Sequence, residues 1–261
     1  MRSTLNMARF IQAVLVLVIL VSVSNMASAA GGYYYQIKIY HFKDKAQEQA
    51  VDAYLKDSYL PRLHRMGIKN VGVFKPLEAD TAKFTYVFVP FKSWKDLQDF
   101  DSKLINSGDA AGGKDYVDAD YKSAPYTRME TILLSAFSTR PAPMVPQLTA
   151  PKADRVYELR SYESPTEKYH YTKVKMFNSG ETDLFDRIKS NPVFYGSVVA
   201  GSHMPNLMYL TAYNSMPERD KHWDAFSNAP EWKALVANDE YKNSVSKNVI
   251  VFLRPTEYSD Y

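Results

Sequence analysis

A segment in which polar and apolar residues alternate occurs twice in this chain, as Tyr35-Gln-Ile-Lys-Ile-Tyr40 and as Tyr157-Glu-Leu-Arg-Ser-Tyr162. In a strand this alternation places Glu158, Arg160 and Tyr162 on one face and the residues between them on the other. A covered carboxylate and guanidinium are costly to bury unless each is paired. The pattern therefore indicates either a structural ion pair or an acid–base site in which Arg160 holds a carboxylate or enolate.

Two further residues are candidates for the same site. Tyr209 belongs to an expected neighbouring strand, residues 207–213, and shares one face of it with Tyr213. His222 precedes Trp223 on an expected helix and is the histidine to test first for heme binding or proton transfer, the alternative being an exposed helix face. The candidate ligand-binding residues are Glu158, Arg160, Tyr162, Tyr209 and His222.

The sequence lacks the residues or motifs on which several other common chemistries depend. The chain has no cysteine, which excludes disulfides, thiolate metal sites and cysteine nucleophiles. Its five histidines show no metal-ligand spacing, and no G-x-S-x-G, P-loop or G-x-G-x-x-G motif is present. We therefore predict no metal and no cofactor, with heme kept as the alternative.

The charge is nearly balanced. The formal net charge of +3 includes Arg2 and Arg9, and no run of Lys and Arg with interleaved aromatic residues occurs. This argues against a nucleic-acid partner. A hydrophobic content of 46% is sufficient for a fold that depends on its core.

Residues 1–29 have the pattern of a secretory signal peptide. Arg2 and Arg9 precede the apolar run from Phe10 to Val23, and Ala27-Ser28-Ala29 is a cleavage site. The apolar run is shorter than the ~20 residues that a spanning helix needs. We expect export, to the periplasm or the medium, with no membrane attachment after cleavage.

The first copy of the repeat predicts the elements that position its polar residues. Tyr34 to Phe42 alternates as a strand, and Ala46 to Met66 carries apolar residues at helical spacing. The elements expected next are strands at Val71 to Phe74 and Phe84 to Phe91, a helix at Trp94 to Ile105 with Ser93 as N-cap, and a strand at Met129 to Phe137.

The second copy predicts the same order of strand, helix, strand, strand, helix, strand. Between the copies, residues 140–153 contain four prolines and predict an extended, stiff connector. We therefore expect structural units at 30–139 and 154–261. The elements expected in the second are Val156 to Tyr162, 165–189, Val193 to Ala200, Leu207 to Tyr213, 217–237 and Val245 to Leu253.

This order is that of the ferredoxin-like α+β unit, whose helices cover one face of an antiparallel sheet. The other face needs a partner, which the second copy supplies. We predict two tandem ferredoxin-like units that form an intrachain α+β barrel, with the sheets facing each other and the helices outside.

The helical segment His222-Trp-Asp-Ala-Phe-Ser-Asn-Ala-Pro-Glu-Trp232, with its W-x-x-F-x-x-x-P-x-W pattern, joins the Tyr157 to Tyr162 motif in the second copy. Together they resemble the NIPSNAP family over residues 154–255. The resemblance implies a dimeric α+β barrel of the kind found in cofactor-free monooxygenases and heme-handling relatives, and it implies no catalytic residue set. The first copy offers Phe100 in place of Trp223 and a 108–113 loop in place of the Pro-containing segment, so we expect any site to lie in the second copy.

Three functions are compatible with these observations. The first is an exported NIPSNAP-like binding module that accepts a small, partly apolar ligand or a protein partner, in the barrel or between sheet and helices. The second is an enzyme, either a cofactor-free monooxygenase or a heme-dependent oxidoreductase. The third is a purely structural protein in which both copies are packed solid. A homo-oligomer is compatible with each.

Overall fold

The strands of the two repeats close into one antiparallel barrel. The structure, a computed structural model, describes residues 31–78, 83–106 and 113–261. The signal segment predicted at 1–29 lies outside the described residues, as do residues 108–112 of the predicted 108–113 loop and residues 79–82 between the second and third predicted strands.

Each repeat supplies four of the strands seen in the described part of the chain. All eight predicted strands are confirmed, with ends that differ by two residues or fewer. The first repeat forms β1 (Tyr34–His41), β2 (Gly72–Pro76), β3 (Phe84–Phe91) and β4 (Arg128–Ala136), and the second forms β5 (Val156–Glu163), β6 (Pro192–Ala200), β7 (Asn206–Tyr213) and β8 (Lys247–Pro255).

The strands follow the order β1-β3-β2-β8-β5-β7-β6-β4 around the closed barrel. β1 and β3 are therefore the inner strands of the first repeat and β5 and β7 those of the second, each hydrogen-bonded to two strands of its own sheet. The repeats meet at two antiparallel seams, β2 with β8 and β4 with β6. This arrangement confirms the predicted α+β barrel, in which each sheet covers the inner face of the other.

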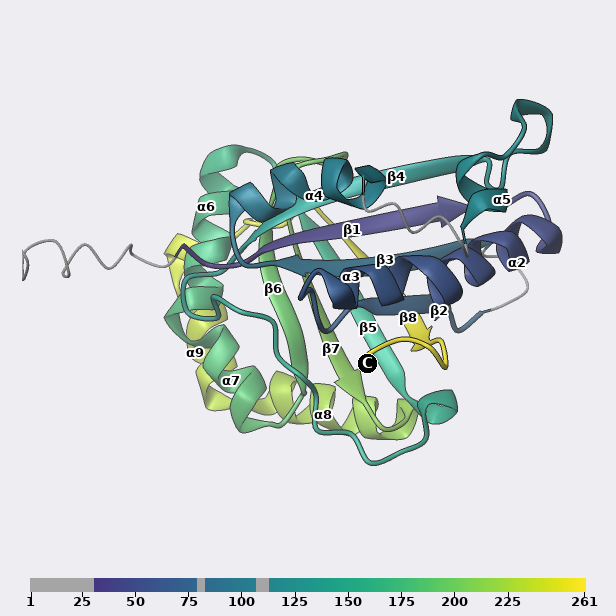
Figure 1. The fold of residues 1–261 in the computed structure, drawn as a ribbon. Helices are drawn as coiled ribbons and strands as arrows, with labels where there is room; N and C mark the ends of the chain where they lie inside the picture. The colour runs from purple at the N-terminus through teal and green to yellow at the C-terminus, as the bar shows by residue number, and fades with distance from the viewer. Residues whose placement is uncertain (1–30, 79–82, 107–112) are drawn as a thin grey trace, which may run out of the picture. The chain divides into compact units, whose positions relative to one another are not determined.

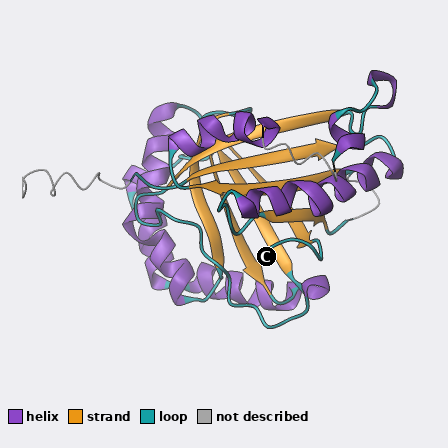
Figure 2. Cartoon of the chain, in the orientation of Figure 1, coloured by secondary structure: helices purple, strands orange, loops and turns teal. Residues whose placement is uncertain are grey.

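Helices lie outside the barrel, against the outer faces of the two sheets (Figures 1 and 2). None of the helices in the described residues has the length and apolar character to span a bilayer. In the first repeat they are α2 (Lys45–Tyr54), η1 (Leu55–Tyr59), α3 (Leu60–Arg65), α4 (Trp94–Asn106), α5 (Lys114–Val117) and η3 (Tyr121–Ser123). The connector holds η4 (Lys152–Asp154), and the second repeat has α6 (Glu167–Met176), η5 (Phe177–Glu181), α7 (Thr182–Arg187), α8 (Met216–Asn228), α9 (Pro230–Ala237) and η6 (Asp239–Tyr241).

Three of the predicted helices are interrupted. The first helix of each repeat contains a π-helical turn, η1 or η5, between two α-helical segments. The predicted helix 217–237 divides into α8 and α9 at Ala229, whose backbone is extended (φ −63°, ψ 134°). Pro230 accounts for this break, because the residue before a proline is driven out of the α region.

Inward-pointing aromatic side chains fill one end of the barrel. Tyr35 of β1 and Tyr157 of β5 are fully buried there. Phe88 and Phe194, one from each repeat, stack with their ring centroids 4.9 Å apart. Tyr261 of the C-terminal tail packs against the same cluster. Two further apolar clusters, one per repeat, fill the space between the outer face of each sheet and its helices.

An offset of 122 residues, as from residue 34 to residue 156, relates β1 to β5, β3 to β7 and α4 to α8. The two helices start from equivalent caps, because the Asp96 amide donates to Ser93 Oγ and the Glu218 amide donates to Ser215 Oγ. Counted from these caps, Trp223 corresponds to Asp101, the residue that follows Phe100. The predicted match of Phe100 with Trp223 is therefore wrong by one position.

Gly180 provides a test of the kinked helix in the second repeat. Its φ of +143° and ψ of −19° lie in a region that L-residues rarely adopt, and a Cβ there would meet no atom within 4 Å. Any cost of Gly180→Ala is therefore backbone strain. We expect the variant to lose about 1–3 kcal/mol of unfolding free energy in a denaturant titration, whereas Ser179→Ala at the exposed neighbouring position should change it by about 0.5 kcal/mol or less. Equal stability of the two variants would contradict the assigned backbone conformation.

Candidate functional site

The carboxylate of Glu158 is fully buried on the outer face of β5 and accepts four hydrogen bonds. Oε1 accepts from Arg160 Nε at 2.6 Å and from Arg219 Nη2 at 2.8 Å. Oε2 accepts from Arg219 Nε at 2.8 Å and from Trp223 Nε1 at 2.7 Å. A carboxylate offers about four lone-pair positions. Side chains of the protein therefore occupy all the hydrogen-bond acceptor positions of Glu158.

Arg160 extends this network along β5. Its guanidinium lies 3.6 Å from the centroid of the Trp223 ring, and Nη1 donates to Tyr162 Oη at 2.9 Å. The Tyr162 hydroxyl is in turn 2.8 Å from Tyr209 Oη. The fold thus brings together four of the residues predicted as ligand-binding candidates, Glu158, Arg160, Tyr162 and Tyr209, and we call them, with Arg219 and Trp223, the β5–α8 network.

The fifth candidate, His222, lies apart from this network. Its ring packs at 5.6 Å from the ring of Tyr213, and its Nε2 is 3.9 Å from Glu218 Oε1. The cavity beside it, of about 550 Å³, is lined by polar and charged side chains such as Asp186 and Lys189. This wall places the carboxylates of Asp186 and Glu218 and the ammonium of Lys189 beside His222, so these residues do not support the heme alternative.

Sequence reasoning missed three charged partners. Arg219 lies one helical turn before Trp223 on α8, and this i, i+4 spacing is the signal that would have placed both on the face toward β5. Lys173 and Glu181 form a second buried pair, with Nζ 3.0 Å from Oε2. Their separation of eight residues spans the π-helical turn η5, whose register the sequence does not reveal.

The two buried carboxylates, Glu158 and Glu181, have pKa values shifted in opposite directions by their surroundings. Burial alone would raise the pKa of Glu158, but the hydrogen bonds from Arg219 and the charge of Arg160 hold its pKa below the ordinary value of 4.5. Burial raises the pKa of Glu181, whose one direct partner among the described residues is Lys173. Glu158 is therefore held ionised by the two arginines, and it fastens α8 to β5.

A cavity of about 160 Å³ lies on the opposite side of β5, at one mouth of the barrel. Leu159, Ser161 and Glu163, the inward residues of that strand, all line it. Its deeper wall is apolar and comes from several strands, with Ile39, Ile132, Leu159, Met208 and Val251. Its rim is polar and comprises Glu130, Ser161, Glu163, Ser202, His203, Asn206 and Lys247. We call this space the mouth cavity.

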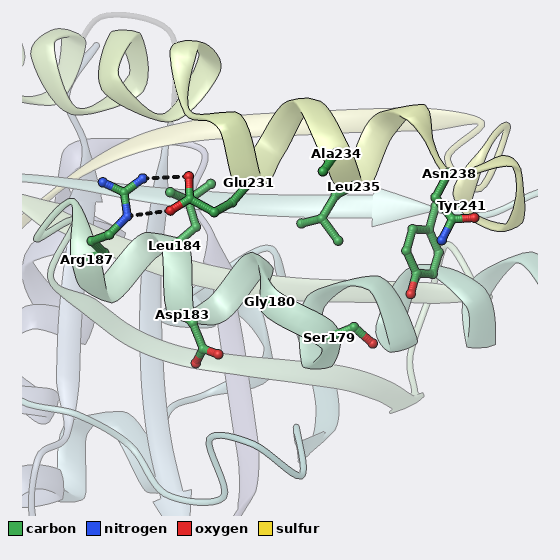
Figure 3. Close-up of a pocket in the computed structure, with 10 residues that line it drawn as sticks. All are labelled: Ser179, Gly180, Asp183, Leu184, Arg187, Glu231, Ala234, Leu235, Asn238 and Tyr241. Carbon is green, nitrogen blue, oxygen red and sulfur yellow. Dashed lines mark hydrogen bonds and ion pairs between the residues drawn. The ribbon is translucent and has the colours of Figure 1, made fainter.

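Other hollows lie on the outside of the barrel. A groove of about 540 Å³ runs between α7 and α9, and Figure 3 shows the paired Arg187 and Glu231 at one end of it. Both charged groups are exposed and bond to each other, with Arg187 Nε 2.9 Å from Glu231 Oε1. A groove of about 520 Å³ lies beside β8, where it includes Ile250 and Phe252 and shares Tyr86 and Val251 with the mouth cavity. None of the four cavities with a described lining contains a residue of the β5–α8 network.

The described residues contain no cluster of side chains suited to binding a metal ion. No group of three or more His, Asp or Glu side chains there is placed to hold a metal ion. The chemistry that the geometry offers is therefore a closed ionic network on the outer face of β5 and an open, amphipathic cavity on its inner face.

Comparison with known proteins agrees with the resemblance noted in the sequence. The NIPSNAP family model matches residues 157–260, which are almost the whole of the second repeat. No curated protein sequence matches the chain.

Three solved structures share the fold over most of the chain. A candidate monooxygenase from Lactobacillus acidophilus NCFM has a TM-score of 0.58 at 12% identity, covering 86% of this chain and 94% of that one. A candidate monooxygenase from Fusobacterium nucleatum has a TM-score of 0.54 at 9% identity, with coverages of 86% and 93%. An anthrone oxidase-like protein has a TM-score of 0.50 at 9% identity, with coverages of 87% and 92%. At such identities the likeness shows the fold alone.

Glu158→Gln tests whether the β5–α8 network is structural. The change leaves the buried Arg160 and the half-buried Arg219 without their shared carboxylate, and we expect a loss of about 3 kcal/mol of unfolding free energy near pH 7. The matched control is Glu231→Gln, which removes an exposed carboxylate from Arg187 and should cost about 1 kcal/mol or less. Urea titration measures both.

The same pair of variants has a pH signature. The folded pKa of Glu158 lies below 4.5, so its contribution to stability is present above pH 4.5 and is lost as the pH falls through the lower folded value. The difference between wild type and Glu158→Gln should therefore shrink on acidification. A difference that is small at pH 7, or that grows in acid, would argue against the structural role.

Proposed function

We propose that this chain, whose residues 157–260 form a NIPSNAP family domain, binds a small, partly apolar ligand in the mouth cavity. The observation that supports this function is the division of the cavity wall into an apolar floor and a polar rim. Small-molecule sites commonly have this composition and commonly occur at the mouths of β-barrels.

The size of the cavity limits the ligand. An apolar cavity of about 150 Å³ accommodates benzene, so a space of about 160 Å³ suits a molecule with one ring or a short alkyl chain. Five strand residues form its floor, and three of these, Ile132, Leu159 and Met208, are at least nine-tenths buried. Covering such a surface with an apolar group instead of water is favourable, at roughly 25 cal/mol per Å².

The β5–α8 network supports this function indirectly. Glu158 bonds to Arg160 and to Arg219 of α8, and the Arg160 guanidinium stacks on Trp223 of α8, so they fix the position of β5 from its outer side. The inner side of the same strand then presents Leu159, Ser161 and Glu163 to the cavity. The network is thus a positioning device for the cavity wall, and not itself the binding site.

Oxygenase activity is the second candidate function. It is favoured by the likeness in fold to the two candidate monooxygenases and to the anthrone oxidase-like protein. It is opposed by the saturation of Glu158 and by the absence of the β5–α8 network from the walls of the described cavities. Export of the mature chain, proposed from residues 1–29, is compatible with either function.

Two tryptophan substitutions on β8 test ligand binding. Val249 and Ile250 are neighbours with nearly equal exposure, 38% and 39%, but Val249 lines the mouth cavity and Ile250 lies on the outer side of the strand. We expect Val249→Trp to fill the opening and weaken the binding of benzyl alcohol by about tenfold or more, corresponding to ~1.4 kcal/mol. Ile250→Trp should leave it unchanged. Saturation-transfer NMR with benzyl alcohol measures both.

The oxygenase alternative has a separate test. We expect no oxygen consumption when purified protein is mixed with anthrone in air, because no residue of the β5–α8 network lines any of the four described cavities. The polarographic rate should equal the rate without protein. Protein-dependent oxygen uptake that disappears in Arg160→Ala, with the melting temperature retained, would support the oxygenase and contradict the structural role of Arg160.

A further inference from the structure

Two carboxylates line the mouth cavity and indicate which charge its ligand carries. Glu130 comes from β4 of the first repeat and Glu163 from the end of β5 of the second, and both line the same space. Their side chains are 39% and 20% exposed, so each is partly withdrawn from water. A site with two carboxylates of this kind favours a ligand group that carries positive charge.

The protein leaves Glu163 without a hydrogen-bond donor among the described residues. Its closest charged neighbours are His203 Nδ1 at 3.3 Å and Lys247 Nζ at 3.8 Å, and neither contact has the geometry of a hydrogen bond. Both neighbours are mostly exposed. This contrasts with Glu158 on the other face of the same strand, whose four acceptor positions are all filled. Glu163 therefore retains acceptor positions for a ligand.

Glu130 is partly satisfied. Its Oε1 is 2.6 Å from His41 Nε2, which leaves Oε2 as a further acceptor. The Tyr86 hydroxyl is close enough for the Glu130 charge to contribute, after burial, to the raised pKa of that tyrosine. Tyr86 also lines the mouth cavity and, as a neutral phenol, adds no charge to it.

The sum of charges at the rim is negative. The formal charges of Glu130, Glu163 and Lys247 at this rim sum to −1. The lysine side chain is 59% exposed and remains solvated. A carboxylate or phosphate ligand would be repelled by two partly buried carboxylates, whereas an ammonium group offers three N–H donors to them. Hydrogen bonds between charged partners are shorter and stronger than neutral ones.

We propose that the mouth cavity binds a small primary amine with an apolar body, whose ammonium group lies between Glu163 and Glu130 and whose body rests on the floor of Ile132, Leu159 and Met208. This assignment of the ligand class rests on the proposed binding function. It places one carboxylate of the site in each repeat, so the site is complete only when the two repeats close into one barrel.

Three probes of nearly equal size separate the charge of the ligand from its shape. Benzylamine is a cation near pH 7, benzyl alcohol is neutral and benzoate is an anion. We expect calorimetric or NMR titration of the full-length protein to give an affinity for benzylamine at least about tenfold above that for benzyl alcohol, corresponding to ~1.4 kcal/mol. Benzoate should bind more weakly than both.

Glu163→Gln tests the residue itself. The amide keeps the shape of the side chain but removes its charge, so the affinity for benzylamine should fall about tenfold while that for benzyl alcohol changes by about twofold or less. The matched control is Glu257→Gln, which removes the same formal charge from an exposed residue outside the cavity lining and should leave both affinities unchanged. Circular dichroism and melting temperature establish that the variants are folded.

The outcomes distinguish the two proposals. If benzyl alcohol and benzylamine bind with equal affinity, or if Glu163→Gln leaves the amine affinity unchanged, the amine assignment is wrong and the binding function stands. If benzoate binds most tightly, the amine assignment is also overturned. If none of the three probes binds to the wild-type protein, the proposed function fails and the amine assignment fails with it.

Discussion

The fold depends on one constraint, which is that each four-stranded sheet has two apolar faces and only one set of helices to cover them. Tyr35 and Ile37 of β1, and Tyr157 and Leu159 of β5, all point away from the helices and would be exposed in an isolated repeat. Burial of such surface is the main favourable contribution to folding. Closing the two sheets into one barrel satisfies both repeats at once, and it also creates the single interior in which the mouth cavity lies.

Strand β5 carries polar residues with different roles on its two faces. On its outer face, Glu158 has its four acceptor positions filled and Arg160 bonds to Glu158 and Tyr162, so their charges hold helix and strand together. On its inner face, Ser161 and Glu163 line the mouth cavity, where Glu163 keeps acceptor positions open. Residues one position apart in the sequence therefore have opposite roles, because successive side chains of a strand point to opposite sides.

The two repeats share a scaffold and differ in their charges. The position of Arg160 is occupied in the first repeat by Lys38, which is buried near Tyr59 and Phe100 and makes no ion pair within the described residues. Burial lowers the pKa of Lys38, with the charge of Asp101 acting in the opposite direction. The first repeat thus has a cation held by aromatic rings where the second has an ionic network. This supports the expectation that the two halves do not carry equivalent sites.

Sequence alone determined the order of elements, the barrel and the alternation that brought Glu158, Arg160 and Tyr162 to one face, because period-2 patterning and an internal repeat are local properties of the chain. It also indicated that this pair would be bonded if covered, as it is. Only the tertiary structure decided which face the helices covered, that Arg219 completes the network, and that Glu130 and Glu163, from different repeats, share one cavity. Those facts depend on distances between residues far apart in the sequence, which no local pattern specifies.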